Sequence, residues 1–331
     1  MASLSQPELI LAQPAVRVGA AACGLGAALP ERLVGNDEAT SRLGVDAAWV
    51  ERRTGIRTRH WAAPGDHLHD LAADAGRRAL ADAGVAAADL DLVLVATVTA
   101  DQVTPACAPL VAAALRAERA GALDVGAACT GFVSALGLGA AMIEAGRATR
   151  VLVIGAEILS RHLDPEDRQT TVIFGDGAGA VVLEAEAGAH IGPVILGADG
   201  ALGNLITAPR DTGFIQMDGH AVFVEAVRRM SEASLAACAA ADVALADLDL
   251  YVFHQANARI LGSLIERLDL PADRVVSAIA GTGNTSAASI PLALNYAREA
   301  GPLQPGSRVL LAAFGAGVTW AATVITWGRD A

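Results

Sequence analysis

The sequence contains no lysine, because all 24 of its basic residues are arginines. A chain without lysine cannot form a Schiff base, which excludes pyridoxal phosphate enzymes and lysine aldolases. It also cannot supply the lysine of a P-loop. Long apolar runs are missing as well: no uninterrupted run reaches about 18 residues, so no membrane-spanning helix and no membrane partner are predicted.

Cysteine is scarce. The four cysteines, Cys23, Cys107, Cys129 and Cys238, are too few among 331 residues for a disulfide framework. Residues 1–13 lack a basic segment followed by an apolar stretch, so a secretory signal is not predicted. We therefore expect a reduced, cytoplasmic protein.

Positive charge is also in deficit, with 36 acidic residues against 24 basic ones and a net charge of −12. This balance disfavours nucleic acid as a partner. No set of His, Cys, Asp and Glu has metal-ligand spacing, and the glycines of residues 175–179 lack the spacing of a dinucleotide fingerprint. Apolar residues are plentiful at 53%, so the chain can bury a large core.

An internal repeat organises the chain. Residues 88–95 (ADLDLVLV) resemble residues 246–253 (ADLDLYVF), and residues 150–153 resemble residues 308–311, both at an offset of 158. Two matches at one offset indicate two similar halves. We expect an N-terminal half, residues 1–187, carrying Cys129, and a C-terminal half, residues 188–331, carrying His254 and Asn284.

The predicted elements alternate between helix and strand. Helical spacing of apolar residues predicts helices over 70–84 and 222–240. Short apolar runs predict strands, at residues 92–98, 151–155, 180–183, 250–253, 309–313 and 321–326. Strands this apolar are buried on both faces, so the fold class is α/β, with the two halves packed as one layered body.

Cys129 is the candidate nucleophile. A short apolar strand leads through Gly126 to Cys129, where a core helix over 129–146 is predicted to begin. The free N–H groups and dipole of that helix favour a thiolate. Gly126 and Gly131 allow a substrate to approach closely. The alternative is a buried core cysteine, which we expect for the other three.

Two further candidates lie in the C-terminal half. His254 ends the strand 250–253, where α/β folds place reactive groups, although it could simply cap the next helix. Asn284 lies at the repeat counterpart of the Cys129 segment and could be a hydrogen-bond donor or an N-cap. The glycine cluster of residues 314–320 could form an oxyanion hole or a tight turn between strands.

Together these segments resemble the thiolase-fold condensing enzymes, specifically β-ketoacyl-acyl-carrier-protein synthase III, over residues 17–327. The resemblance rests on seven segments: residues 49–57, 123–136, 164–168, 174–179, 254–257, 283–288 and 314–320. The family fold is a duplicated half, in agreement with the offset of 158 residues.

The resemblance implies a Cys129–His254–Asn284 triad. Cys129 takes an acyl group from acyl-CoA as a thioester, and malonyl carrier protein then enters and loses CO2. His254 and Asn284 stabilise the resulting enolate, which attacks the acyl group. The oxyanion hole is implied to use the Cys129 N–H and an N–H of residues 314–317, which include Ala316 and Gly317. Phe314 crowds the malonyl carboxylate.

The resemblance also implies a CoA site, with acyl-CoA as substrate rather than cofactor, and no metal. The adenine would lie between Trp49 and Arg168, and Arg53 and Thr54 would contact the nucleotide and its phosphates. Gly219 and Asn257 would line the pantetheine channel. The partners implied are acyl-CoA, malonyl carrier protein docked beside Arg259, and a second copy in a homodimer.

Several residues depart from the family pattern. Thr104 replaces a bulky residue that closes the acyl pocket, and Val224 replaces a basic residue of the carrier-protein patch, for which Arg228, Arg229 and Arg267 are expected to compensate. These departures keep open an acyltransferase that passes the acyl group to an alcohol or amine. A non-catalytic scaffold is disfavoured by the intact triad, and a thiolase by the lack of a second cysteine near Val318.

Overall fold

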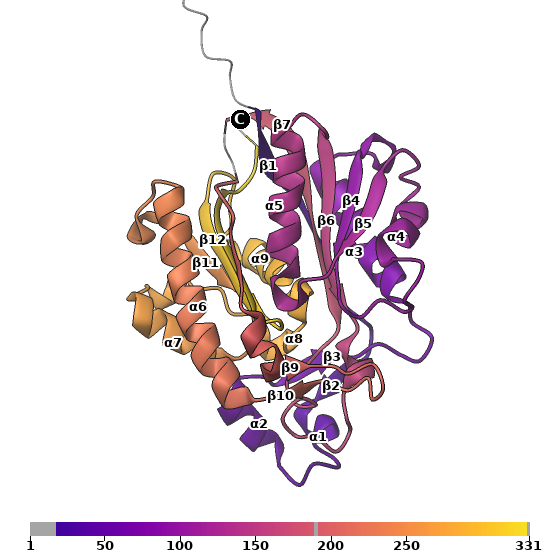
Figure 1. Cartoon of the computed structure of the whole chain (residues 1–331), viewed down its shortest axis with the longest axis vertical. Helices are drawn as coiled ribbons and strands as arrows, with labels where there is room; N and C mark the ends of the chain where they lie inside the picture. Colours follow the sequence, from indigo (N-terminus) through magenta and orange to yellow (C-terminus); the bar gives the residue numbers. More distant parts are fainter. Residues whose placement is uncertain (1–17, 189–190, 330–331) are drawn as a thin grey trace, which may run out of the picture.

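The computed structural model describes residues 18–188 and 191–329. Residues 1–13, on which the expectation of no secretory signal rests, lie outside the described residues. The chain forms two principal sheets with helices on their outer faces and between them (Figure 1).

The first sheet has five strands in the order β1-β7-β6-β4-β5. β4 runs parallel to both of its neighbours, β5 and β6, whereas β7 runs antiparallel to β6 and β1. β4 is buried along its whole length, as its unbroken apolar sequence predicts. The bounds are β1 Val18–Ala28, β4 Leu92–Ala96, β5 Gly121–Val125, β6 Arg150–Glu157 and β7 Gly177–Ala187.

The second sheet has four strands in the order β11-β12-β13-β8. β11 and β12 are parallel, and β13 returns antiparallel to both β12 and β8. The bounds are β8 Ile195–Ala198, β11 Leu250–Phe253, β12 Arg308–Gly315 and β13 Thr319–Thr326. Strands of the first sheet thus come from residues 18–187 and those of the second from residues 195–326; the domain boundary itself stays a prediction.

The helices make the layers. α3 (Leu68–Ala83) and α4 (Cys107–Leu115) cover the outer face of the first sheet, and α6 (Gly219–Ala240) and α7 (Ala258–Leu268) cover that of the second. α5 (Gly131–Glu144) and α9 (Ser289–Glu299) pack between the two sheets in one shared apolar core (Figure 1).

The repeat is visible element by element at the same offset of 158 residues. β6 and β12 begin at Arg150 and Arg308, and the 3-10 turns Ala128–Thr130 and Ser286–Ala288 precede α5 and α9. Ala128 and Ser286 even share a left-handed backbone, with φ values of 45° and 48°. Both central helices therefore enter the core through the same tight turn.

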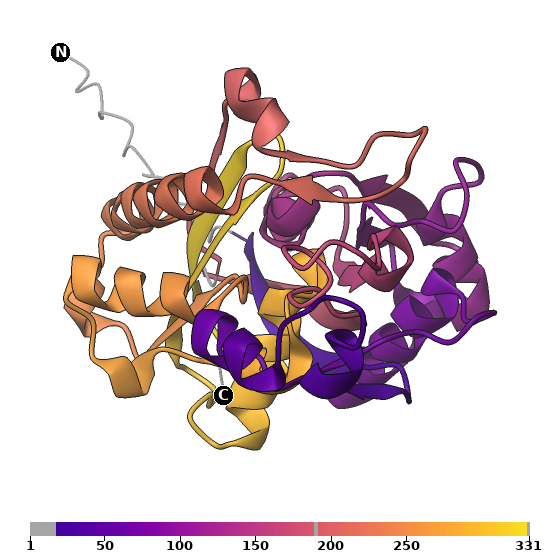
Figure 2. The same cartoon turned by 90° about the horizontal axis from the view of Figure 1, so that it is seen from below.

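Smaller elements close one end of the body. The segment after β1 crosses to the C-terminal half, where the Arg57 N–H donates to Ala280 O at 2.9 Å (Figure 2). The elements at this end are β2 Leu33–Gly35, α1 Asn36–Ala39, α2 Ala47–Thr54, β3 Thr58–His60, β9 Ile206–Thr207, β10 Gln216–Met217 and α8 Ile279–Thr282. The other 3-10 turns are Ala87–Asp89, Leu159–His162, Gly200–Leu205, Leu245–Asp247 and Ala272–Arg274.

The predicted elements are present, with ends shifted by a few residues: the helix expected over 70–84 is Leu68–Ala83, and that over 222–240 begins at Gly219. β1 was not predicted. Its glycines let α3 lie directly on it, since a Cβ at Gly26 would be 2.2 Å from Ala75 O. Among the described residues, no helix is both long enough and apolar enough to span a membrane.

Candidate active site

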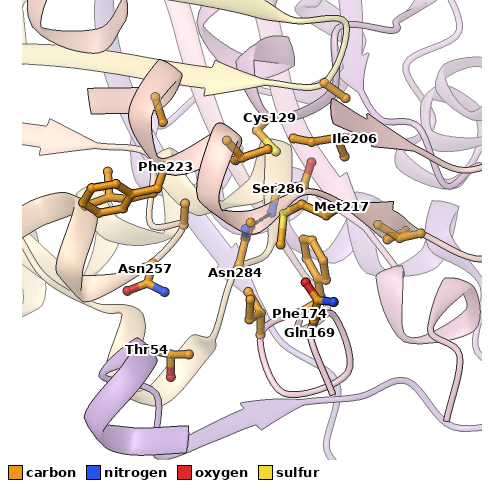
Figure 3. Close-up of a pocket in the computed structure, with 18 of the residues that line it drawn as sticks. Thr54, Cys129, Gln169, Phe174, Ile206, Met217, Phe223, Asn257, Asn284 and Ser286 are labelled. Atoms are coloured by element: carbon orange, nitrogen blue, oxygen red, sulfur yellow. Dashed lines mark hydrogen bonds between the residues drawn. The ribbon is translucent and has the colours of Figure 1, made fainter. Parts of the chain in front are cut away.

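A cavity of about 680 Å³ lies between the two halves and contains nearly all the predicted site residues. Cys129, His254 and Asn284 line it together, as do Phe314 and Ala316. Figure 3 shows Cys129 and Asn284 in its wall. The predicted CoA-site and docking residues line it as well: Trp49, Arg53, Thr54, Arg168, Gly219, Asn257 and Arg259. Residues more than 200 positions apart in the sequence therefore share one site.

Cys129 lies in the 3-10 turn just before α5 and is partly exposed to the cavity. The chain passes very close to it, because a Cβ at Gly315 would be 2.8 Å from the Cys129 nitrogen. Burial raises the pKa of the Cys129 thiol to about 12, against a lowering contact from the Ser286 side chain. Desolvation thus opposes the thiolate that the helix N-terminus was expected to favour.

His254 follows β11 directly and is held from two sides. Its backbone N–H donates to Ala312 O at 2.8 Å, and its Nδ1 lies 2.6 Å from the Ser289 hydroxyl at the start of α9. The ring is only 2% exposed. Burial lowers the pKa of His254 to about 3, so the imidazole is neutral and its Nε2 is the atom free to meet a ligand.

Asn284 is fixed in orientation by its own turn. Its Oδ1 accepts from the Ser286 N–H at 2.9 Å, but the N-cap of the following 3-10 turn is Thr285, so Asn284 is not itself the N-cap. Its backbone is bridged to residues 173–175, with the Asn284 N–H donating to Ile173 O at 2.9 Å. With Oδ1 engaged, the donor Nδ2 is the group left for a substrate oxygen.

An aromatic ring between two cations lies in the wall of the cavity. Asp46 caps α2 and accepts from the Trp49 N–H at 2.6 Å. The Arg53 and Arg168 guanidinium carbons lie 4.9 Å and 5.9 Å from the centre of the Trp49 ring. A purine inserted between Trp49 and Arg168 needs roughly 7 Å, twice an aromatic contact distance, so Arg168 must swing outward to admit one.

The predicted channel residues occupy helix starts. Gly219 opens α6, and Asn257 caps α7 by accepting from the Arg259 N–H at 2.9 Å. The Arg259 guanidinium lies 6.0 Å from the Phe223 ring. Arg259, which is expected to contact the carrier protein, thus lies beside the cavity and packs on the face of an aromatic ring.

The glycine cluster forms the turn between β12 and β13, as one of its two interpretations proposed. Phe314 is 3% exposed and borders the cavity. Gly317 is not among the residues that line the cavity, and its carbonyl oxygen lies 3.3 Å from the position that a Cβ of Gly203 would take. The contribution of Gly317 to an oxyanion hole stays a prediction.

Sequence reasoning missed most of the apolar wall. These residues come from loops and short strands, where no periodicity marks an inward side chain: Val98, Leu159, Phe174, Ile206, Ile215 and Met217. Thr104, expected to shape the acyl pocket, is exposed and outside the wall of the single chain.

The carrier-protein patch also differs from expectation. Val224 is 48% exposed on α6. Arg228 is bound by Glu225 at 2.5 Å, and Arg229 by Asp199 at 3.1 Å. Paired in this way, these two arginines offer little net positive charge to compensate for Val224.

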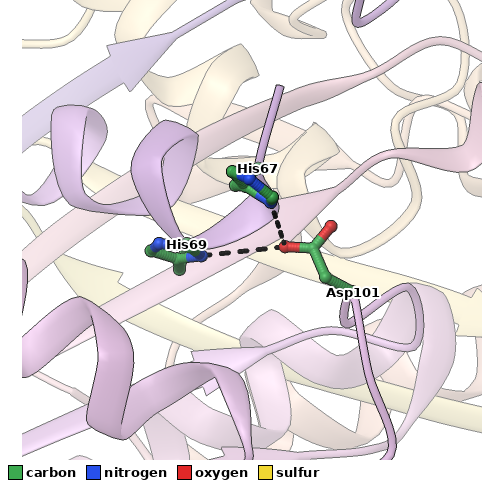
Figure 4. A group of neighbouring side chains, drawn as sticks. All are labelled: His67, His69 and Asp101. Atoms are coloured by element: carbon green, nitrogen blue, oxygen red, sulfur yellow. Dashed lines mark ion pairs between the residues drawn. The ribbon is translucent and has the colours of Figure 1, made fainter. Parts of the chain in front are cut away.

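A second cluster lies outside the cavity, where His67, His69 and Asp101 converge (Figure 4). Spacing along the sequence did not predict this group, because Asp101 comes from a separate loop. Asp101 Oδ2 accepts from the Leu68 N–H at 3.0 Å, and Oδ1 binds Arg161. Both carboxylate oxygens thus serve to cap α3 and to tie two loops together.

Comparison with known proteins agrees with this geometry. Models of 3-oxoacyl-[acyl-carrier-protein] synthase III and of its C-terminal domain match residues 123–200 and 238–327. The chain is 48% identical to β-ketoacyl-[acyl-carrier-protein] synthase III 2 of Streptomyces coelicolor over 94% of each chain. It is also 48% identical to the Bordetella petrii synthase III, over 90% of this chain and 94% of the relative.

The chain belongs to the β-ketoacyl-acyl-carrier-protein synthase III family. Solved structures agree: the Pseudomonas aeruginosa synthase III superposes with a TM-score of 0.89 at 43% identity, covering 95% of this chain and 99% of that one. The priming β-ketosynthase of a polyketide biosynthetic pathway superposes with a TM-score of 0.91 at 35% identity, covering 98% and 100%. The thiolase-like fold that the resemblance implied is confirmed.

Proposed function

We propose that this enzyme condenses an acyl-CoA starter with malonyl-acyl carrier protein through an acyl-Cys129 thioester, and so initiates a fatty acid or polyketide chain. One observation carries the proposal: a single cavity joins Cys129, His254 and Asn284 to the cation-flanked ring of Trp49. Relatives that cover almost the whole chain are named as synthases of this reaction type.

The site suits both half-reactions. The Cys129 sulfur, once deprotonated, attacks the thioester carbonyl of acyl-CoA and releases CoA. Malonyl-thioester decarboxylation then places negative charge on the thioester oxygen. His254 Nε2 and Asn284 Nδ2 are neutral donors, so they stabilise this enolate without protonating it fully. The enolate carbon attacks the acyl-Cys129 carbonyl, and the thiolate of Cys129 leaves.

The acyl group has an apolar place to lie. Beyond the triad the wall is built from aliphatic and aromatic side chains, including Ile206, Ile215 and Phe174. A hydrocarbon starter gains about 0.8 kcal/mol for each CH₂ that it buries there. We therefore expect starters longer than acetyl to acylate Cys129 readily.

We further propose that the enzyme works as a cytoplasmic homodimer. β5 is an edge strand of the five-stranded sheet, and its Leu123 is 41% exposed. Val98 and Val103, in the loop after β4, are 53% and 83% exposed. An open strand beside exposed aliphatic side chains favours pairing with a second copy. The four free thiols agree with a reducing compartment.

Intact-protein mass spectrometry tests the reaction. The enzyme is incubated with a panel of acyl-CoAs and then with malonyl carrier protein, with Cys129→Ala as the control. We expect an acyl adduct on the wild type alone, removed by malonyl carrier protein with appearance of a β-ketoacyl product. An adduct that persists until an alcohol or amine is supplied would show the acyltransferase instead. Light scattering at the same concentration reports the dimer.

A further inference from the structure

A buried carboxylate lies behind the nucleophile. Glu157, the last residue of β6, is completely inaccessible to solvent. Its Oε2 accepts from the Thr99 hydroxyl at 2.6 Å, the Thr97 hydroxyl at 3.1 Å and the Val98 N–H at 3.1 Å. None of these donors is charged. Burying a carboxylate without a charged partner costs free energy. The presence of Glu157 here therefore points to a functional role.

The other oxygen of Glu157 points toward the active site. Oε1 accepts from the Ser286 hydroxyl at 3.0 Å. The Ser286 side chain also interacts with the Cys129 thiol, where it lowers the pKa, and is drawn beside it in Figure 3. Ser286 thus bridges the nucleophilic sulfur to a carboxylate, across the boundary between the two halves.

His254 is a poor acceptor for the proton of Cys129. It is buried, its Nδ1 is held by Ser289, and its pKa is lowered to about 3. Burial raises the pKa of Glu157 to about 7, so this group exchanges a proton near neutrality. Among the described residues, Glu157 interacts electrostatically with two titratable groups, the thiols of Cys107 and Cys129. Burial raises the pKa of both thiols to about 12, so both are protonated at neutral pH.

We propose that Glu157 is a positioning residue that stores the Cys129 proton during the catalytic cycle, received and returned through the Ser286 hydroxyl. This inference rests on the proposed function, because the synthase reaction defines when the proton is stored and when it is returned. His254 and Asn284 are then left to stabilise the enolate as neutral donors.

The proton balance closes over one turnover. The Cys129 S–H proton passes to Ser286 Oγ while the Ser286 proton passes to Glu157, and the sulfur forms its bond to the acyl carbon. The C–S bond of acyl-CoA breaks, and the CoA thiolate takes a proton from solvent. After condensation the Cys129 thiolate leaves the acyl group, and the stored proton returns from Glu157 through Ser286.

Alkylation of Cys129 by iodoacetamide tests the relay without any thioester substrate, so its outcome is independent of the proposed synthase reaction. The rate is measured by mass spectrometry from about pH 5 to pH 10 for wild type, Glu157→Gln and Ser286→Ala. For the wild type we expect a rise with an apparent pKa near 7. Both variants should lose this rise and react at least about tenfold more slowly at pH 7.

Two controls separate a relay from a structural role. Glu184→Gln removes a carboxylate from β7 that pairs with Arg150 and Arg329, and its profile should match the wild type. Ser286→Ala keeps the Glu157 carboxylate, so it remains informative if Glu157→Gln does not fold. A wild-type pH profile in Ser286→Ala, or in folded Glu157→Gln, would overturn the proposal.

Discussion

The contact between Gly315 and the nucleophile can be tested by adding a single methyl group. Gly315 ends β12, and a Cβ placed there would be 2.8 Å from the Cys129 nitrogen and 3.2 Å from its Cβ. Ordinary contacts are about 3.5–4.0 Å, so Gly315→Ala must push Cys129 away by roughly 0.5–1 Å. The backbone at Gly315 is not left-handed, so the perturbation is purely steric.

A displacement of this size acts mainly on catalysis. Overpacking costs about 1–3 kcal/mol of stability, whereas misplacing a reacting atom by about 1 Å costs up to ~100-fold in rate. We expect Gly315→Ala to acylate 10- to 100-fold more slowly, by these principles, while still unfolding cooperatively. Stopped-flow release of CoA in a single turnover measures the step.

A matched variant isolates the cause. Gly126 precedes Cys129 by three positions, and a Cβ there would have nothing within 4 Å. Although Gly126 was expected to allow close approach of a substrate, it does not line the cavity, so Gly126→Ala should acylate at the wild-type rate. An unchanged acylation rate in Gly315→Ala, or an equal loss in both variants, would refute the steric argument.

Three other perturbations follow from the contacts of the site. Ser289→Ala removes the partner of His254 Nδ1 at 2.6 Å and should slow condensation about tenfold, with acylation less affected; partitioning of acyl-enzyme after malonyl carrier protein is added measures this. Arg168→Ala should raise the KM for acyl-CoA about 3- to 30-fold, but not that for an acyl-pantetheine, which lacks the adenine. Burial raises the pKa of Glu157 to about 7 in the folded protein, against about 4.5 in the unfolded chain, so the free energy of unfolding of the wild type falls as pH rises. Glu157→Gln lacks this titration. Urea unfolding should therefore show the free energy of unfolding of the variant increasing by up to about 3 kcal/mol relative to wild type between pH 4 and pH 8.

The sequence predicted the parts of the fold that depend on local pattern. The apolar strand Leu250–Phe253 is predicted residue for residue, and the offset of 158 recovers the starts of β6 and β12. β1 escaped prediction because its alanines and glycines follow no strand periodicity. They make sense only once α3 is seen to lie on Gly24 and Gly26.

The candidate site, like the fold, was predicted only in part. Cys129, His254 and Asn284 are marked by their places at the ends of predicted strands and turns, and the cavity brings them together. Their ionisation could not be predicted from those places, because it depends on how completely other parts of the chain bury them. That is why the thiol of Cys129 has its pKa raised when the helix N-terminus alone suggested the opposite.

The duplicated fold explains how so many functional groups fit into one small volume. Each of them has a small residue at the equivalent position of the other half, 158 residues away: Cys129 with Ala287, His254 with Ala96, Asn284 with Gly126, Ser286 with Ala128, and Glu157 with Gly315. The two halves face one another here, as shown by Gly131 of the N-terminal half, whose Cβ would lie 3.6 Å from Ala287 of the C-terminal half. At this junction a small residue of one half leaves room for a functional residue of the other, as Gly315 does for Cys129. The Gly315 test above adds a methyl group at the position equivalent to Glu157, where the nearest atoms belong to Cys129 of the other half.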